Sequence, residues 1–122
     1  MRPSFLRIQV FAFVFVFTQQ FTTIFIIYFI LYYTMQKYLA EFLGTLFFVY
    51  VILATNNPLA IGLTLTLVIF LLQKISGGHV NPAVTIAMIS NGKLSTNDLI
   101  PYIIAQVFGG LAALEIYKKW KL

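Results

Sequence analysis

The sequence has 122 residues, of which 61% are hydrophobic and only 9% are charged. This composition excludes an ordinary soluble domain and is typical of a membrane protein that crosses the bilayer several times. The formal net charge of +5 comes from basic residues that stand singly or near the chain ends, which indicates contact with lipid headgroups and not with nucleic acid. The chain has no cysteine, so disulfides, thiol chemistry and cysteine metal sites are excluded.

Four apolar segments each approach the ~20 residues that a membrane-spanning helix requires. They cover residues 8–33, 38–55, 59–75 and 99–117. The last three are separated by polar, turn-rich stretches at residues 55–58, 76–85 and 90–98. The sequence therefore predicts an all-α integral membrane protein.

The last polar stretch carries signals for the end of one helix and the start of the next. Asn91 and Gly92 form a typical helix stop. Ser95 and Asp98, three residues apart, resemble a capping box, and Pro101 fits a helix only near its first turn. We expect the last helix to begin here.

Residues 82–90 are apolar but too few to cross a bilayer. As a helix, this segment rises roughly 13–14 Å, about half of a ~30 Å hydrocarbon core. Such a segment predicts a re-entrant helix, which enters from one face and ends near the midplane. The alternative is an amphipathic helix at the membrane surface that follows an ordinary loop.

The residues before this short segment favour the re-entrant interpretation. Asn81 takes the N-cap position and Pro82 the first helical position, so the amide NH₂ of Asn81 stays free. Gly77 and Gly78 allow an extended backbone whose carbonyls turn outward and which ends at the positive end of the helix. Because non-helical backbone at membrane depth must line protein or a water-filled cavity, we expect half of a polar pore.

Three stretches together resemble one family of membrane channels. They are "AEFLGT" at 40–45, "SGGHVNPAVT" at 76–85 and "YIIAQVFGG" at 102–110. Their order and spacing are similar to the first half of the aquaporin and aquaglyceroporin (major intrinsic protein) family, over about residues 35–117. The resemblance implies half of an inverted-repeat fold, with three transmembrane helices and one re-entrant half-helix. It also implies a channel for water or small neutral solutes such as glycerol.

The resemblance assigns roles to residues of the short helix. Asn81, Pro82 and Ala83 match the first of the family's two asparagine motifs, where the asparagine donates a hydrogen bond to single-file water and the helix dipole opposes cations and protons. Gly78 and His79 precede the motif, and His79 is expected to turn its backbone carbonyl to the pore. A lone histidine provides neither a metal site nor a catalytic pair, so we do not expect an enzyme.

Two polar residues are implied to support the re-entrant loop. Glu41 matches a buried carboxylate in the family's first helix, and Gln106 matches a polar residue in its third; both are expected to contact the loop backbone. The alternative is that Glu41 extends to the headgroups, although an acid within a membrane usually has a partner. Gly44 and Thr45, three and four residues further on, form a small, polar stripe that favours the partnered carboxylate.

The sequence departs from the family in two respects. Ile61, followed by the matching Gly62, stands where strict water channels have an aromatic wall of the narrow filter, so a smaller, apolar wall is implied. The second repeat, with its own asparagine motif and filter arginine, is absent from these 122 residues. Because the two half-helices of an inverted repeat meet near the midplane, we expect the chain to need a second half.

Residues 1–34 fit the family poorly and are expected to form a separate N-terminal hydrophobic extension, with residues 35–122 as the channel repeat. Arg2 and Arg7 before an apolar core suit a signal peptide, but no small-residue cleavage pattern follows. Two explanations of residues 1–34 remain: an uncleaved membrane anchor, or a mis-start, in which the start of the chain is assigned upstream of the true one. We favour the mis-start. Without the extension, the lysines divide evenly between the two membrane faces, which permits a dual topology.

Three functions remain open at this point. The first is half of a channel for passive movement of water or small neutral solutes, working with a second half or family member in an oligomer. The second is a non-transporting subunit that docks on a complete channel, and the third is an inactive fragment. All three place the chain in the lipid bilayer as a multi-pass protein, and we expect no cofactor, metal or nucleic acid.

Overall fold

The computed structural model describes residues 3–120 and the side chains of residues 6–120. Within this range the chain is all-helical, as the composition predicts, with no strand. The elements are α1 (Pro3–Ala54), α2 (Pro58–Leu72), α3 (Pro82–Ser90), the 3₁₀ turn η1 (Thr96–Asp98) and α4 (Leu99–Lys119). The chain divides into two units, Met1–Thr34 and Met35–Leu122. Arg2 lies outside the described residues.

The sequence predicts two separate segments up to residue 55, whereas the structure has one continuous helix, α1. The extra N-terminal hydrophobic helix that the sequence predicts is therefore continuous with the helical segment that follows it. Residues 34–37 are Thr-Met-Gln-Lys, which include neither glycine nor proline, so nothing in them ends a helix. Two helical stretches are long and apolar enough to cross a membrane, Leu6–Ala54 and Thr96–Lys119.

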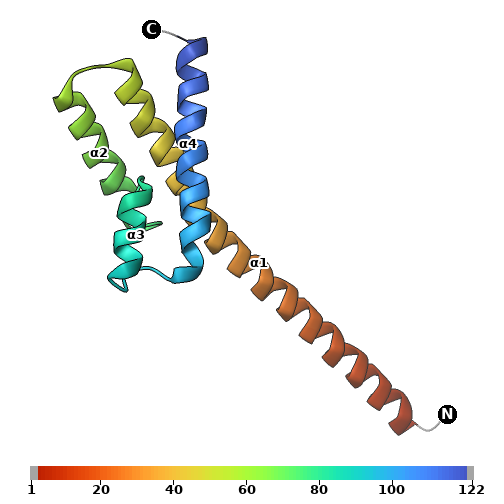
Figure 1. The fold of residues 1–122 in the computed structure, drawn as a ribbon. Coiled ribbons are helices and arrows are strands. Elements are labelled where there is room, and N and C mark those ends of the chain that lie inside the picture. Colours follow the sequence, from red (N-terminus) through yellow and green to blue (C-terminus); the bar gives the residue numbers. More distant parts are fainter. Residues whose placement is uncertain (1–2, 121–122) are drawn as a thin grey trace. The chain divides into compact units, whose positions relative to one another are not determined.

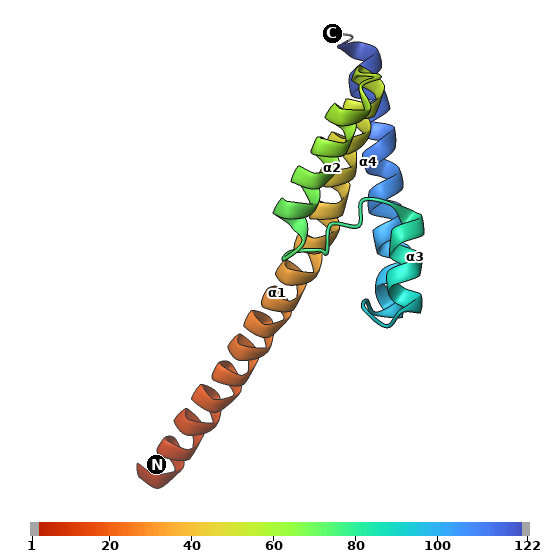
Figure 2. The same ribbon diagram turned by 90° about the vertical axis from the view of Figure 1, so that its left-hand side faces the viewer.

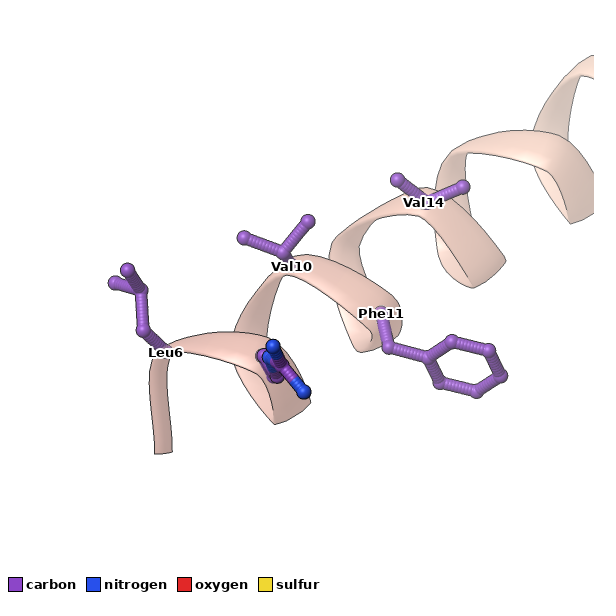
Figure 3. A pocket seen from close by; sticks show the side chains of 5 residues that line it. Leu6, Val10, Phe11 and Val14 are labelled. Carbon is purple, nitrogen blue, oxygen red and sulfur yellow. The ribbon is translucent and has the colours of Figure 1, made fainter. Parts of the chain in front are cut away.

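The part of α1 in the first unit exposes its apolar side chains. Leu6, Val10 and Val14 follow one another along the helix and, with Arg7 and Phe11, border an open hollow (Figure 3). All five side chains belong to one helix, so this hollow is a groove of the helix surface and not a binding site. An apolar helix surface of this kind suits contact with lipid tails.

In the second unit, the end of α1, α2 and α4 lie side by side, and α3 lies beside the first half of α4 (Figures 1 and 2). Asn57 caps α2, since its Oδ1 accepts from the backbone N–H groups of Leu59 and Ala60 at 2.9 and 3.3 Å. α2 has 15 residues and ends at Leu72, before the predicted end of this segment. The next four residues, including the polar Gln73 and Lys74, form turns.

Small residues allow the helices of this unit to approach closely. A Cβ added at Gly109 of α4 would overlap the carbonyl oxygen of Phe42 in α1. Gly44 of α1 is also enclosed, because its added Cβ would lie 2.5 Å from Leu72 Cδ1 and 2.9 Å from Val80 Cγ1. The small stripe in the sequence therefore lies at a close helix crossing.

The signals around residues 90–101 are partly confirmed. Asn91 is the C-cap of α3 and Gly92 has a φ of 70°, which confirms the helix stop. Pro101 lies in the first turn of α4. The predicted capping box is wrong, because Ser95 caps η1 and not α4, accepting from the N–H of Asn97 at 3.3 Å.

Asp98 instead joins the start of α4 to α1. Its Oδ1 accepts from Lys37 Nζ and from the hydroxyl of Tyr38, both at 2.7 Å. The Asp98 carboxylate is therefore occupied by α1 and does not cap its own helix. The ion pair fixes the end of α4 nearest the short helix α3.

Candidate functional site

The short helix α3 has nine residues, Pro82–Ser90, the same bounds that the sequence predicts. Asn81 is its N-cap, because Oδ1 accepts from the backbone N–H of Ala83 at 2.8 Å. The Asn81 side chain is exposed and, with its oxygen engaged, keeps its NH₂ group as a donor. At ~1.5 Å per residue, α3 covers only about half of a hydrocarbon core.

The loop before α3 has an unusual backbone. Gly77 and Gly78 have φ values of 93° and 62°, which glycine adopts without steric cost. Val80 has a φ of 44°, and it is the one non-glycine residue with positive φ among residues 3–120. For a β-branched residue this conformation costs on the order of 1–3 kcal/mol, so neighbouring groups must hold the loop.

Glu41 is fully buried and holds this loop. Its Oε1 accepts from Ser76 Oγ at 2.7 Å and from the backbone N–H of His79 at 2.9 Å. Its Oε2 accepts from the N–H of Val80 at 2.7 Å and from Gln106 Nε2 at 2.9 Å. Four donors fit the ionised carboxylate, an acceptor only, and offset the cost of burying its charge.

Gln106 is placed differently from the prediction. Its Nε2 donates to Glu41 Oε2 at 2.9 Å and to Thr85 Oγ1 at 2.8 Å, and in the described part of the chain it makes no hydrogen bond to the loop backbone. The amide nitrogen is used by the Glu41 carboxylate and the Thr85 hydroxyl, so Gln106 is linked to the loop backbone through Glu41. Gln106 Oε1 and Thr45 Oγ1 are buried without a hydrogen-bond partner among residues 3–120.

The ring of His79 is buried beneath the loop. Its Nδ1 lies 3.2 Å from Thr85 Oγ1, and its ring centroid lies 5.4 Å from that of Tyr102. Tyr102 in turn donates its hydroxyl to the carbonyl oxygen of Ser76 at 2.7 Å. A Cβ at Gly77 would lie 2.9 Å from His79 Nε2, so the ring fills the space under the glycine.

Three polar residues of this network were not singled out from the sequence: Ser76, Thr85 and Tyr102. Two of them follow a simple rule, because residues four apart lie on one face of a helix. Thr85 lies four residues after Asn81, and Tyr102 lies four residues before Gln106. Helical spacing from the predicted residues would have found both.

A hollow of about 280 Å³ lies at the N-terminus of α3. Its polar side consists of Asn81 and the loop backbone, and its apolar side comes from α1, α2 and α3. The lining residues are Phe48, Leu65, Ile69, Gly77, Gly78, His79, Val80, Asn81, Val84 and Met88. The sequence did not indicate Phe48, Leu65 or Ile69.

Ile61 does not line this hollow. It lies four residues before Leu65 and eight before Ile69 on α2, so it continues the same side of the helix. Next to it, Gly62 has open space where a Cβ would be. The hollow thus offers a free amide donor and a positive helix end opposite an apolar wall, which suits small neutral polar molecules and disfavours cations.

The sequence of the chain is similar to those of known membrane proteins. The model of the family described as "Major intrinsic protein" matches residues 52–121. A "Glycerol uptake facilitator protein-like 6" of Lactiplantibacillus plantarum is 45% identical over 95 residues, which cover 70% of this chain and 44% of the relative. "Aquaporin Z" of Photorhabdus laumondii is 39% identical over 97 residues, covering 67% and 42%. "Aquaporin-8" of Notomys alexis is 41% identical over 95 residues, covering 69% and 36%.

The chain spans less than half the length of these curated relatives. The matched region includes α2, the loop, α3 and α4, and therefore the whole hollow except its α1 side. Proteins of this family are integral membrane channels and not enzymes, in agreement with the prediction from the sequence. By these matches, the chain belongs to the major intrinsic protein family.

Proposed function

We propose that this chain supplies one half of a membrane channel for passive movement of water or small neutral solutes such as glycerol. The observation that carries the proposal is the hollow at the N-terminus of α3, which Asn81 lines with a free amide donor. A donor beside an apolar wall replaces one hydrogen bond of a passing water without holding it tightly. The positive end of α3 adds a barrier to cations.

The names of the relatives support this class of solute, since two are called aquaporins and one a glycerol uptake facilitator protein-like protein. In this proposal residues 35–120 form a multi-pass unit, in which the end of α1, α2 and α4 cross the bilayer and α3 re-enters it. Pro82 and Ala83 start the half-helix, Glu41 and Gln106 support its loop, and Ile61 forms part of the filter wall.

The half-channel needs an opposing half. α3 reaches only the midplane of a ~30 Å core, so its positive end requires a second half-helix to complete a hydrogen-bonding path. We infer that a second half of the same family, assembled with residues 35–120, provides it. The alternatives of a non-transporting subunit and an inactive fragment predict no flux in this assembly.

The test compares two asparagines that have the same local structure. Asn81 caps α3 and Asn57 caps α2, and each precedes a proline at the first helical position. The chain is reconstituted in liposomes with the second half of a relative, and water flux is measured by osmotic light scattering. Asn81→Ala is expected to reduce the flux at least several-fold, because the donor in the hollow is lost, whereas Asn57→Ala is expected to leave it nearly unchanged. Equal effects of both variants would refute the role of Asn81.

A further inference from the structure

Two buried polar atoms are not satisfied by the network that Glu41 organises. They belong to Thr45 of α1 and Gln106 of α4, which expose 5% and 1% of their surface. The hydroxyl oxygen of Thr45 and the carbonyl oxygen Oε1 of Gln106 are both enclosed, and neither has a hydrogen-bond partner among residues 3–120. Buried polar atoms without a partner are costly, so a pair of them between two neighbouring helices indicates a shared partner.

The orientation of the Gln106 carboxamide is determined by its neighbours. Its Nε2 donates to Glu41 Oε2 at 2.9 Å and to Thr85 Oγ1 at 2.8 Å. The reversed carboxamide would direct its oxygen at the Glu41 carboxylate, which only accepts hydrogen bonds. Both hydrogens of the NH₂ group are therefore used, and Oε1 remains as an unused acceptor.

The hydroxyl of Thr45 differs from those of four other helical threonines. Each of those four donates to a carbonyl oxygen of the preceding helical turn, at 2.8 or 2.9 Å: Thr18, Thr23, Thr64 and Thr66. Thr45 Oγ1 makes no such bond. Its hydroxyl is therefore available to a group outside its own helix.

The two atoms lie at the same crossing of α1 and α4. Glu41, which accepts from Gln106, comes four residues before Thr45 on α1. Gly109 comes three residues after Gln106 on α4, and a Cβ added to it would lie 3.2 Å from Thr45 Cβ. Residues three and four apart share one face of a helix, so the side chains of Thr45 and Gln106 lie on the facing sides of the two helices. Gly109 has no side chain that could bind either atom.

We propose that one buried water molecule bridges the Thr45 hydroxyl and Gln106 Oε1. The water donates one hydrogen to Oε1 and accepts the hydrogen of the Thr45 hydroxyl. These two partners are the minimum that buried waters have in globular proteins. The bridge extends the buried polar network by one turn of α1 and ties α1 to α4 beside their close contact at Gly109.

The enclosure of the site determines what it binds. Neither atom reaches the surface, so a lipid headgroup or a side chain of another protein has no access to them. Water is small and provides both the donor and the acceptor that the two atoms need. The site is separate from the hollow at the N-terminus of α3, whose lining includes neither Thr45 nor Gln106.

The first test is Thr45→Val, since valine has nearly the shape of threonine but no hydroxyl. Unfolding of the purified full-length chain is followed by circular dichroism during SDS titration in mixed micelles. Loss of the bridge leaves Gln106 Oε1 without its partner, so the unfolding equilibrium constant is expected to rise roughly 5- to 30-fold. If the hydroxyl had no partner, the same change would be neutral or stabilising. The matched control is Thr64→Val, which removes a bond within one helix and is expected to change the constant less than about threefold.

The second test detects the water itself by NMR. The full-length chain is labelled with ¹³C in its threonine methyl groups and placed in deuterated detergent micelles. Magnetisation transfer from water protons is expected at the methyl group of Thr45, with the sign of a water that stays bound longer than the protein takes to rotate. A direct hydrogen bond between Thr45 and Gln106, formed by a small side-chain rotation, would also make Thr45→Val destabilising but would give no such transfer.

The proposal is overturned if Thr45→Val is neutral or stabilising, or if the Thr45 methyl group receives no magnetisation from water. Both measurements use the chain alone and neither depends on transport. Their outcome is therefore independent of the proposed channel.

Discussion

Replacement of Glu41 by glutamine perturbs the polar network with almost no change in volume. The carboxylate accepts from four donors, two at each oxygen. Glutamine keeps one acceptor oxygen and replaces the other by an NH₂ group. The least costly orientation leaves the oxygen facing Val80 and Gln106. The NH₂ group then faces Ser76, whose hydroxyl can rotate to accept, and the N–H of His79, which cannot.

The expected loss of stability follows from this count. One buried N–H, that of His79, loses its acceptor at a cost of about 1–3 kcal/mol. The remaining hydrogen bonds lose their charge assistance, which makes each of them weaker. We therefore expect Glu41→Gln to lower the free energy of unfolding by about 2–4 kcal/mol. Glu41→Ala removes all four acceptor contacts and is expected to cost more, because the strained backbone of Val80 is then no longer held.

The assay is reversible SDS titration of the purified chain in mixed micelles, with helix content followed by circular dichroism. Hydrogen exchange of residues 76–80 is measured in parallel and is expected to become faster. The matched control is Glu115→Gln, an exposed acid that pairs with Lys118 three residues away at 2.9 Å. Its effect on stability is expected to be small, because exposed ion pairs contribute little. A Glu41→Gln loss below ~0.5 kcal/mol with unchanged exchange would refute the reasoning, since even one orphaned buried N–H costs more.

Three further predictions test other parts of the structure. Gly109→Ala is expected to destabilise the chain by ~1–3 kcal/mol in the same titration, because its Cβ overlaps α1. Gly110→Ala is expected to be tolerated, because its Cβ would be 3.9 Å from Val49 Cγ2. Equal stabilities of the two variants would contradict the close crossing of α1 and α4. Ile61→Phe is expected to slow glycerol entry more than water flux in the assembled channel, as measured by solute-induced swelling, and an unchanged glycerol rate would remove Ile61 from the filter wall. Deletion of residues 1–34 is expected to leave the osmotic permeability of the assembled channel unchanged, and loss of permeability in inserted protein would contradict the assignment of this chain's half-channel to residues 35–120.

The short helix was predictable because local signals act over a few residues. Asn81, Pro82 and the Asn91–Gly92 stop determine both ends of α3, and the structure reproduces them. The junction at residues 34–37 was not predictable from hydropathy, because a polar interruption in an apolar pattern does not end a helix that has no breaking residue. Apolar periodicity reports what surrounds a segment, whereas helix ends depend on backbone chemistry.

The polar network was only partly predictable, because its contacts join residues far apart in the sequence. The resemblance to the family indicated Glu41 and Gln106. The sequence could not show that Glu41 accepts the hydrogen bonds of the loop N–H groups. Nor could it show that Gln106 donates to Glu41 and Thr85. Likewise, the position of Asp98 in the sequence suggested a local capping box. In the structure its carboxylate binds Lys37 and Tyr38 of α1 instead. Such competition between local and distant partners is decided only by the fold.

The requirement for an opposing half is tested most directly by osmotic shrinkage of liposomes that contain the purified chain in a single orientation. The account predicts permeability equal to that of lipid for the chain alone. Addition of the second half of a relative during reconstitution is expected to raise the permeability, and Asn81→Asp is expected to reduce that rise. Rapid, selective water flux from the singly oriented chain without a second half would contradict the half-channel account.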